Sequence, residues 1–361
     1  MTAPADQVAR LRLIRSDHIG PVTFAHLLAR FGSAQTALDA IPDLARRGGG
    51  RSAKIAGAEQ VEREIATVRQ LGARYLFRGR AGYPALLAEV ESAPPALIVA
   101  GDATLLDKPM VAMVGARNAS AAACRFARQL AHGLGEAGSV IVSGLARGID
   151  TAAHDGAFDT GTVAVIAGGI DVFYPAENEA RQRAIGEKGV LVAEQPPGVE
   201  PRARHFPYRN RIIAGLAAGT VVIEAAPKSG SLITARYAAE FGREVMAIPG
   251  SPLDPRAQGC NLLIREGATL VQSADDVLEA LRPLHLGAAR PATRHAVADS
   301  ALDMDDAERK AIRDLLSATP VHVDELIRQS GLAAAAVQLV LLELELAGHL
   351  TRHAGGRVSL A

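Results

Sequence analysis

Seven short apolar segments in the middle of the chain constrain its fold more than any other feature. They alternate with longer stretches of helical pattern and cover residues 109–114, 139–142, 162–167, 190–193, 220–223, 244–248 and 268–271. Their runs of Val, Ile and Ala are continuous, as in strands that are buried on both faces by crossover helices. The sequence therefore predicts a doubly wound α/β domain with a mostly parallel sheet, which we place at residues 73–285.

Ligands of such sheets bind where the carboxyl ends of the strands meet the N-termini of helices. Five loops follow the predicted strands: 114–120, 143–150, 167–171, 195–211 and 228–234. Gly115 allows a sharp exit from its strand, and we expect Ser120 and Asp150 to cap the helices that follow. Neither a Walker P-loop nor a complete G-x-G-x-x-G motif is present, so the glycines are either structural or part of an anion site.

The fourth loop leads into a segment that is rich in arginine and aromatic residues. Five basic side chains surround Phe206 and Tyr208: Arg202, Arg204, His205, Arg209 and Arg211. No acidic residue occurs between Pro201 and Ile223. Cations follow a phosphate backbone and aromatic rings stack on unpaired bases, so the segment suits a single-strand groove. An arginine network paired with carboxylates is the competing interpretation.

Composition limits where a nucleic acid could bind. Lys and Arg together number 39, and Asp and Glu together also number 39, so the formal net charge is zero. Binding of a nucleic acid therefore requires a local basic patch. The two cysteines have no metal-site spacing, and neither a secretory segment nor a run long enough for a bilayer is present. We therefore expect a cytoplasmic protein without a membrane partner, a metal or a cofactor.

The central domain shows no catalytic constellation. Neither H-E-x-x-H nor G-x-S-x-G occurs. His154 could act as a base, but no nucleophile accompanies it, and we interpret it as an ordinary helix residue. Glu224, at the end of its predicted strand, is expected to orient Arg209 or Arg211. The sequence therefore predicts a protein that binds a ligand at this site and is not an enzyme.

Residues 1–72 have the pattern of a small helical domain. A helix ending at Ile19-Gly-Pro21 is followed by a second that runs to Phe31, and the Gly-Pro turn resembles helix-hairpin-helix and sterile-alpha-motif-like modules. Such modules often contact the nucleic-acid backbone. A plain scaffold or interaction domain is the alternative.

After a predicted linker at 286–302, residues 303–361 have a winged-helix pattern of three helices and two strands. The third predicted helix, 333–347, contains no Lys or Arg and has two glutamates, Glu343 and Glu345. A helix without cations gains little from phosphate neutralisation. We predict that this domain does not read duplex sequence and instead contacts protein or the rest of the chain.

Several long motifs together resemble the DNA-processing protein A (Smf) family. They are Gly115-Ala-Arg117, Ser143-Gly-Leu-Ala-Arg-Gly-Ile-Asp150, Phe206-Pro-Tyr-Arg-Asn-Arg-Ile-Ile-Ala-Gly-Leu216, Ser229-Gly-Ser-Leu-Ile-Thr-Ala235 and Ile248-Pro-Gly-Ser251. The resemblance implies an extended Rossmann-like domain. It also implies a non-catalytic protein that coats incoming single-stranded DNA during natural transformation, loads RecA and works as a homodimer.

The resemblance also implies a set of strand-contacting residues. Arg117 corresponds to the arginine of a Gly-Ser-Arg-type loop, although Ala116 stands where the family commonly has Ser or Thr. Arg204 and Phe206 correspond to the basic and aromatic residues that lead into the Arg-Asn-Arg run. The remaining expected groove residues are Gly115, Arg209, Asn210, Arg211, Lys228, Ser229, Ser231 and Thr234.

The alternative function is a nucleotide-processing enzyme, such as a nucleotide phosphoribohydrolase on a related fold. Those enzymes typically carry Pro-Gly-Gly-x-Gly-Thr-x-x-Glu, and this chain has Ile248-Pro-Gly-Ser-Pro252 in its place. Release of a base from a nucleoside monophosphate would favour the enzyme. A pure scaffold would show no affinity for oligo-dT.

Overall fold

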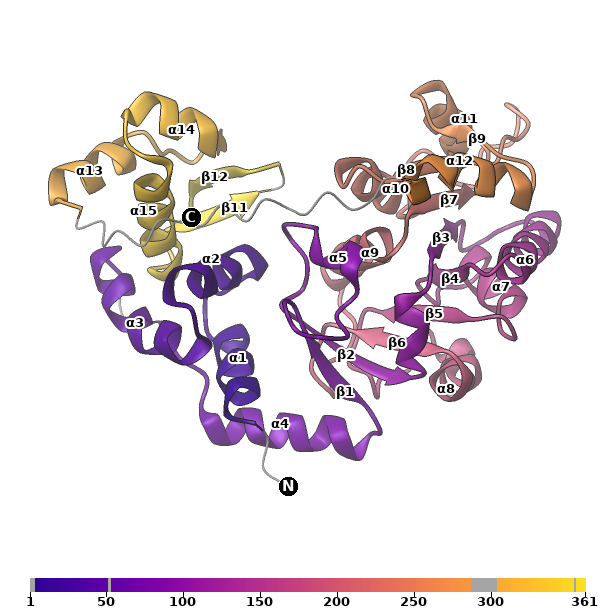
Figure 1. Cartoon of the computed structure of the whole chain (residues 1–361). Coiled ribbons are helices and arrows are strands. Elements are labelled where there is room, and N and C mark those ends of the chain that lie inside the picture. The colour runs from indigo at the N-terminus through magenta and orange to yellow at the C-terminus, as the bar shows by residue number, and fades with distance from the viewer. Residues whose placement is uncertain (1–3, 51–52, 287–303, 354) are drawn as a thin grey trace. The chain divides into compact units, whose positions relative to one another are not determined.

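The computed structural model describes residues 4–50, 53–286, 304–353 and 355–361 (Figure 1). It consists of two compact units: Glu64–Pro291 forms one, and Met1–Arg63 together with Ala292–Ala361 forms the other. We call them the Rossmann unit and the terminal unit. All but the first residue of the predicted linker, 286–302, lies outside the described residues.

A nine-stranded sheet forms the centre of the Rossmann unit, in the order β1-β2-β6-β5-β4-β3-β7-β8-β9. The strands are β1 (Arg74–Phe77), β2 (Ala96–Gly101), β3 (Met110–Gly115), β4 (Val140–Ser143), β5 (Thr162–Ile166), β6 (Val190–Ala193), β7 (Gly219–Ile223), β8 (Glu244–Ala247) and β9 (Thr269–Leu270). The strands from β3 to β9 are parallel, which confirms the prediction for the seven apolar segments. Strands β1 and β2, which are antiparallel and are joined without a long crossover helix, were not predicted from the sequence.

Helices cover both faces of this sheet. Val111 and Met113 pack on the face with α6 (Ala121–Glu136), α7 (Ile149–Gly156) and α12 (Ala274–Leu286), and α8 (Glu179–Lys188) packs over Leu191 on that side. Ala112 and Val114 face the opposite core, with α5 (Ala85–Ala88), α9 (His205–Leu216), α10 (Ser231–Glu240) and α11 (Gln258–Arg265). Two short 3-10 helices, η1 (Ala103–Asp107) and η2 (Ala176–Asn178), complete the unit.

The order of the strands creates a switch point at β3. The chain passes from β3 through β4 and β5 to β6, and α9 then carries it back across the sheet to β7, on the other side of β3. In doubly wound sheets the crevice at such a point, outside the carboxyl ends, is the usual ligand site. A Cβ on Gly115 would lie 1.9 Å from the carbonyl oxygen of Ile223, so this crossing of chains requires glycine.

The terminal unit combines helices from both ends of the chain. Its elements are α1 (Ala5–Arg15), α2 (Pro21–Phe31), α3 (Ala34–Arg47), α13 (Asp306–Asp314), α14 (Val323–Ser330), α15 (Ala334–Leu346), β10 (Val321–His322), β11 (Leu350–His353) and β12 (Arg357–Leu360). α4 (Ala58–Gln70) spans the boundary between the units. The predicted break at Gly20-Pro21 is confirmed, because α2 begins at Pro21. The predicted helices and strands of the winged helix are confirmed as well.

The winged-helix core is continuous with the core of the N-terminal helices. Buried residues of α15 share one cluster with Leu27 of α2 and Ile41 of α3. A Cβ on Gly48 would lie 2.1 Å from the carbonyl oxygen of Glu343, which shows how closely the end of α3 approaches α15. The domain was predicted to contact protein or the rest of the chain, and this shared core shows the second of these contacts. That the domain does not read duplex sequence stays a prediction.

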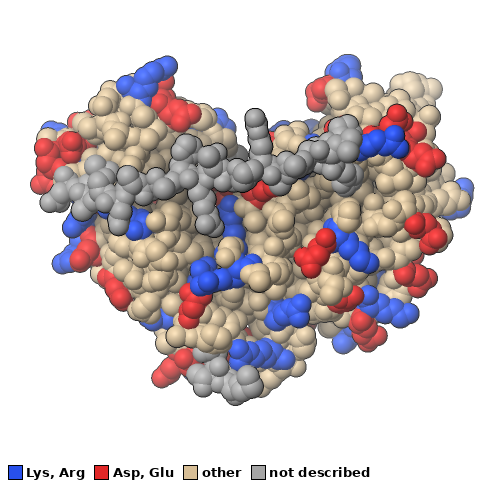
Figure 2. Space-filling model, viewed as in Figure 1, with Lys and Arg blue, Asp and Glu red and all other residues tan. Residues whose placement is uncertain are grey.

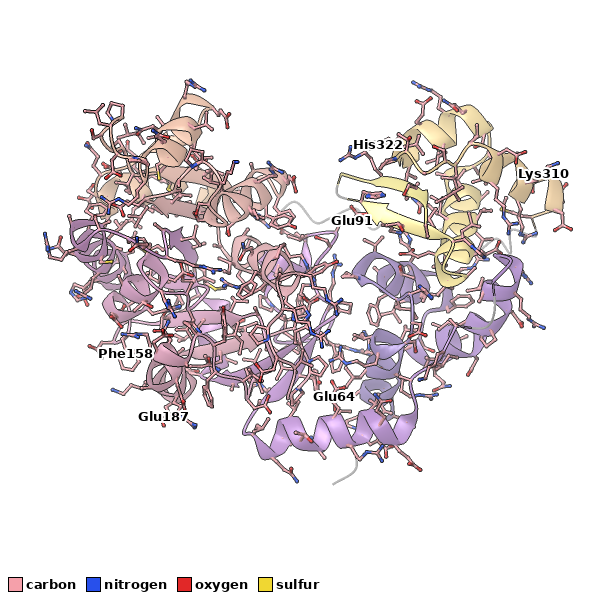
Figure 3. The ribbon with its side chains drawn as sticks, turned by 180° about the vertical axis from the view of Figure 1, so that it is seen from behind. Glu64, Glu91, Phe158, Glu187, Lys310 and His322 are labelled. Carbon is pink, nitrogen blue, oxygen red and sulfur yellow. The ribbon has the colours of Figure 1, made fainter. Side chains whose placement is uncertain are left out.

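Both glutamates of α15 form ion pairs inside the terminal unit. Glu343 is buried and lies 3.0 Å from Nε of Arg309 on α13. Glu345 lies 2.9 Å from Nε of Arg352 on β11. These carboxylates stabilise the packing of α15, and neither is presented at the surface as a free charge. At the outside of the same unit, Figure 3 shows the exposed Lys310.

Positive and negative side chains are interspersed over the face of the molecule drawn in Figure 2. This distribution agrees with the equal numbers of basic and acidic residues. Within the described parts of the chain, no single helix has the length and apolar character of a membrane span, although α14 and α15, bent by 119° at their junction, meet that test as a pair.

Candidate nucleic-acid interface

An aromatic ring near the start of α9 lies beside the exit of β3. Phe206 is half-buried, and its ring centre is 5.7 Å from that of Tyr174, with the two rings tilted by 56°. The guanidinium carbon of Arg117, in the loop after β3, is 5.4 Å from the centre of the Phe206 ring. We call Phe206, Tyr174 and Arg117 the aromatic platform. Tyr174 is 48% exposed and Arg117 is exposed, so the platform is open to solvent.

Two paired loops place Tyr174 beside Phe206. The backbone N–H of Gly169 donates to the carbonyl oxygen of Val199 at 2.8 Å, and that of Gly198 donates to Oδ1 of Asp171 at 2.8 Å. A Cβ on Gly169 would meet the carbonyl of Pro196 at 2.5 Å, so glycine is required. Tyr174 could not be assigned to the site from the sequence, because its contact with Phe206 depends on loops that follow different strands.

Two further arginines extend the positive charge ahead of α9. Arg202 and Arg204 are both exposed. His205 is buried between them and the core, and its Nδ1 accepts a hydrogen bond from the backbone N–H of Arg202 at 3.2 Å. This bond fixes the turn that precedes the helix. The predicted Arg204 is thus available for a phosphate contact.

Arg209 lies behind the platform in the interior. Its side chain is 7% exposed, and its Nη1 lies 3.9 Å from Oδ2 of Asp150, which is also 7% exposed. Burial lowers the pKa of Arg209 to about 10, so the guanidinium stays charged at neutral pH. Burial raises the pKa of Asp150, and the charge of Arg209 opposes this shift. Both partners of the pair are held away from solvent.

Asp150 does not cap α7 as the sequence analysis expected. Its Oδ2 accepts hydrogen bonds from the backbone N–H groups of Gly144 and Ala146, at 3.1 and 3.3 Å. The helix begins at Ile149, and Gly148 occupies the cap position with a φ of 77°. The correction has a simple reason, since the carboxylate folds back over the loop that precedes the helix and satisfies its amides.

Arg211 lies on the inner side of α9. It is 5% exposed, and its Nη2 donates to Oε1 of Glu194 at 2.5 Å. Its Nη1 donates to the carbonyl oxygen of Ser92 at 2.6 Å. The guanidinium therefore connects α9 to β6 and to the segment before β2, and it does not reach the open side of the platform.

Glu224 pairs with neither arginine, which corrects the expectation that it orients them. Its carboxylate accepts hydrogen bonds from the backbone N–H and the hydroxyl of Ser120, at 2.8 and 2.7 Å. The hydroxyl oxygen of Ser120 also accepts a bond from the backbone N–H of Ala123, so the predicted helix cap is confirmed. Glu224 therefore connects the end of β7 to the start of α6.

The start of α10 forms a second part of the carboxyl edge. Lys228 is exposed and Ser229 is half-buried, with its hydroxyl 2.7 Å from that of Ser231. Ser231 and Thr234 are buried in the first turns of α10. Nδ2 of Asn210, on α9, donates to the carbonyl oxygen of Gly230 at 3.3 Å and so connects the two helices.

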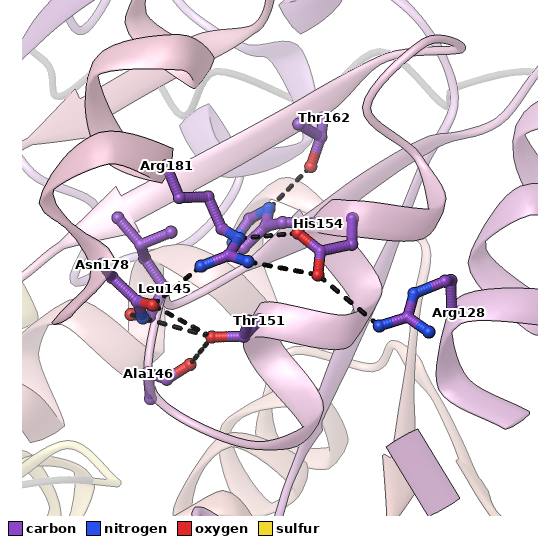
Figure 4. A network of polar contacts seen from close by, with 9 residues as sticks. Arg128, Leu145, Ala146, Thr151, His154, Thr162, Asn178 and Arg181 are labelled. Carbon is purple, nitrogen blue, oxygen red and sulfur yellow. Dashed lines mark hydrogen bonds and ion pairs between the residues drawn. The ribbon is translucent and has the colours of Figure 1, made fainter. Parts of the chain in front are cut away.

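His154 belongs to the interior and has no nucleophile beside it. Its Nδ1 lies 2.7 Å from the hydroxyl of Thr162, and the residue is completely buried (Figure 4). Burial lowers its pKa to about 3, so the ring is neutral. Asp155, one residue further on, pairs with Arg181 of α8 at 2.6 Å in the same network. His154 is thus a buried residue of α7 whose ring bonds Thr162, and its lack of a catalytic role stays a prediction.

A metal site is not evident in the described ranges, where no three His, Cys, Asp or Glu side chains gather. Away from the platform, the outer side of the Rossmann unit has ordinary surface contacts. Nζ of Lys188, for example, lies 5.3 Å from the ring centre of Phe158, which Figure 3 shows near Glu187.

Comparison with known proteins identifies the family of this chain. The model of DNA recombination-mediator protein A matches residues 74–282, which is more than half of the chain. The chain belongs to this family. A DprA-like N-terminal HHH domain matches residues 4–67, and a DprA winged helix domain matches residues 296–356.

Individual members of the recombination-mediator family align over much of the chain. The DNA processing protein DprA of Streptococcus pneumoniae is 50% identical over 198 residues, 54% of this chain and 70% of that protein. Protein Smf of Escherichia coli is 38% identical over 289 residues, 77% of this chain and 75% of that protein.

Solved structures of family members share the fold. The crystal structure of DprA from Streptococcus pneumoniae superposes with a TM-score of 0.63 at 37% identity, covering 77% of this chain and 98% of that one. A structure of DNA processing protein A from Helicobacter pylori, described for its single-stranded DNA binding mode, gives a TM-score of 0.53 at 27% identity. It covers 58% of this chain and 96% of that one. The chain thus has the Rossmann-like fold of the family, with its helical N-terminal and winged-helix domains.

Proposed function

We propose that this protein binds single-stranded DNA at the aromatic platform and acts as a recombination mediator. The observation that carries the proposal is the half-buried Phe206 ring, which lies at the carboxyl edge of the sheet beside an exposed tyrosine and an exposed arginine. Aromatic rings combined with cations suit a strand whose bases are unpaired. The Helicobacter pylori relative, described for its single-stranded DNA binding, supports the same ligand class.

Each exposed side chain has a distinct proposed role. Arg117, Arg204 and Lys228 hold phosphates, because they are the exposed cations of the predicted set. Phe206 stacks on a base, and Tyr174 extends the stacking surface. The remaining predicted residues shape the site from within the protein. Buried beneath it are Arg209, Asn210, Arg211, Ser231 and Thr234, and half-buried are Gly115 and Ser229.

A salt series of oligo-dT binding tests this assignment. Three neutralised phosphates should give log affinity against log salt a slope of about −2, at roughly 0.7 per phosphate. Duplex DNA of the same length should compete poorly, because its bases are not free to stack. A slope near zero, or equal affinity for the duplex, would contradict the proposed groove.

The mediator role includes protection of the strand and transfer to RecA. It is supported by membership of the recombination-mediator family. Adding RecA to a complex of this protein with labelled oligo-dT should produce RecA filaments faster than RecA alone does, and nuclease digestion of the strand should be slowed before transfer. No acceleration at any ratio of the two proteins would limit the function to strand binding.

The protein is proposed to act without catalysis. The amides of Gly144 and Ala146, which could otherwise receive a nucleotide phosphate, already bond Asp150. Incubation with nucleoside monophosphates should therefore release no free base. Detection of base release that depends on residues of this loop would instead support the nucleotide-processing alternative.

We further propose a homodimer formed through the Rossmann unit. A groove of about 770 Å³ lies between α10 and α11, lined in part by Leu232, Leu262 and Leu263. Ile233, which also lines it, is 39% exposed, and Leu270 on β9 is 46% exposed. Lys228 and Ser229 of the proposed strand site border the same groove. Apolar side chains at a sheet edge suit burial against a second copy. Ile233→Asp should shift the mass measured by sedimentation from dimer to monomer, whereas a wild-type monomer at micromolar concentration would refute the dimer.

A further inference from the structure

A buried ion pair lies directly behind the aromatic platform. Arg209 and Asp150 face each other at 3.9 Å, and the guanidinium carbon of Arg209 is 5.9 Å from the centre of the Phe206 ring. Arg117 approaches the same ring to 5.4 Å. Both cations are thus within cation–π distance of one ring. Asp150 is the carboxylate that compensates the charge of Arg209, the buried cation of the two.

The backbone fixes Asp150 in this place. Its carboxylate accepts bonds from two amides of the loop that precedes α7. The N–H of Ile149 donates to the carbonyl oxygen of Ala116 at 3.2 Å, which ties the start of α7 to the loop that carries Arg117. A Cβ on Gly144 would lie 1.3 Å from Nη1 of Arg209, so the arginine fills the space that a side chain would need.

We propose that Asp150 is a positioning residue of the strand-binding site: acting through Arg209, it fixes Phe206 as a stacking surface and does not itself touch the strand. The proposal rests on the proposed function. Its physical basis is that an unpaired guanidinium in a buried position is costly and moves toward water. A movement of the Arg209 guanidinium would occur beneath the Phe206 ring. It would also bring Arg209 toward Arg117 with no carboxylate to offset the repulsion of the two cations.

Asp150→Asn tests the proposal, because it keeps the shape of the side chain and removes its charge. Oligo-dT affinity should fall about five- to tenfold, the lower part of the range for one stacked base. The slope against salt should not change, because the phosphate contacts remain. Asp155→Asn is the matched control, since it removes an arginine-paired carboxylate from the same helix, away from the platform.

An oligomer of abasic deoxyribose phosphate separates positioning from a general structural effect. It offers phosphates without bases, so wild type and Asp150→Asn should bind it equally. Gly144→Ala is a second variant that displaces Arg209 without changing any charge, and it should reproduce the loss on oligo-dT. Melting temperatures of all variants show whether each is folded at the temperature of the binding measurement.

Binding of the two oligomers by these variants separates a positioning role of Asp150 from a general structural one. Equal or tighter binding of oligo-dT by folded Asp150→Asn and Gly144→Ala would overturn the proposal. A loss that is equally large on the abasic oligomer, or equally large in Asp155→Asn, would overturn it too. Failure of the wild-type protein to bind oligo-dT would instead overturn the proposed function itself.

Discussion

Two helices of this chain occupy positions associated with nucleic-acid binding, and they differ in what they expose. α9 follows two exposed arginines and begins with a half-buried aromatic ring, while the arginines inside the helix pair with carboxylates. α15 is the third helix of a winged-helix fold, but nine of its side chains are buried and both its glutamates are paired. The fold position of α15 suggests DNA, whereas most of its side chains are buried and it contains no Lys or Arg, so we expect no duplex recognition.

The difference shows that a fold supplies a location and that side chains supply the function. At α9 the return crossover from β6 to β7 leaves the start of the helix at the open edge of the sheet. At α15 the buried side chains pack in one core with those of the N-terminal helices α2 and α3. The winged helix, a domain common in duplex recognition, here contributes α15 to the core of the terminal unit.

The largest expected effect tests the burial of α15. Val340→Asp places an unpaired charge in the shared core and should destabilise the terminal unit by about 4 kcal/mol. Hydrogen exchange should rise together in α15 and α3, because the two helices share that core. Ala335→Asp, on an exposed position of the same helix, is the control. Exchange that rises in α15 alone would show that the two ends of the chain are not one cooperative unit.

A smaller effect tests the exposed end of α9. Phe206→Ala should weaken oligo-dT binding by about 1–3 kcal/mol, the value of one stacked base. Tyr208→Ala is the informative comparison, because Tyr208 is 55% exposed on the same helix but contacts Arg211 and not the platform. We expect Tyr208→Ala to cost less, as measured by fluorescence anisotropy. The reverse ranking would move the stacking surface to Tyr208.

The sequence predicted the parallel strands, the helix breaks and the winged helix, because these follow from local patterns of apolar residues. Arg117 and Phe206 could be identified from the character of their loops and from the family motifs. The division of the arginines in α9 could not, because burial of Arg209 and Arg211 depends on carboxylates from distant strands and loops. Tyr174 and the shared core of the two chain ends likewise depend on contacts between segments far apart in sequence.

Acid should destabilise both units, since each contains a histidine whose pKa is lowered, His154 fully buried and His26 half-buried. Burial lowers the pKa of His154 to about 3 in the Rossmann unit and that of His26 to about 4 in the terminal unit, from 6.5 in both cases. Below pH 6.5 the unfolded chain binds protons that the folded chain does not, so stability falls with falling pH. The loss between pH 7 and 5.5 should be about 1 kcal/mol per histidine.

Urea unfolding of single variants assigns that loss to a unit. His154→Asn should flatten the pH dependence of the Rossmann unit alone, and His26→Asn that of the terminal unit alone. An unchanged pH dependence in the His154 variant would mean that other groups dominate. Platform experiments are then best made well above pH 6.5, where His154 no longer lowers the stability of the Rossmann unit.

The smallest effect concerns the charge of the platform. Arg117→Ala should weaken oligo-dT binding about three- to fivefold at moderate salt and reduce the steepness of the salt slope by about 0.7, the contribution of one phosphate. Arg282→Ala removes an exposed cation from α12, on the opposite face of the sheet, and should leave the slope unchanged. Because both variants change the net charge equally, a common change would indicate a general attraction of the strand to the protein. A flattened slope in Arg117→Ala alone would place a phosphate beside Phe206, where the loop after β3 presents a cation to the start of α9, whereas α15 contains no Lys or Arg.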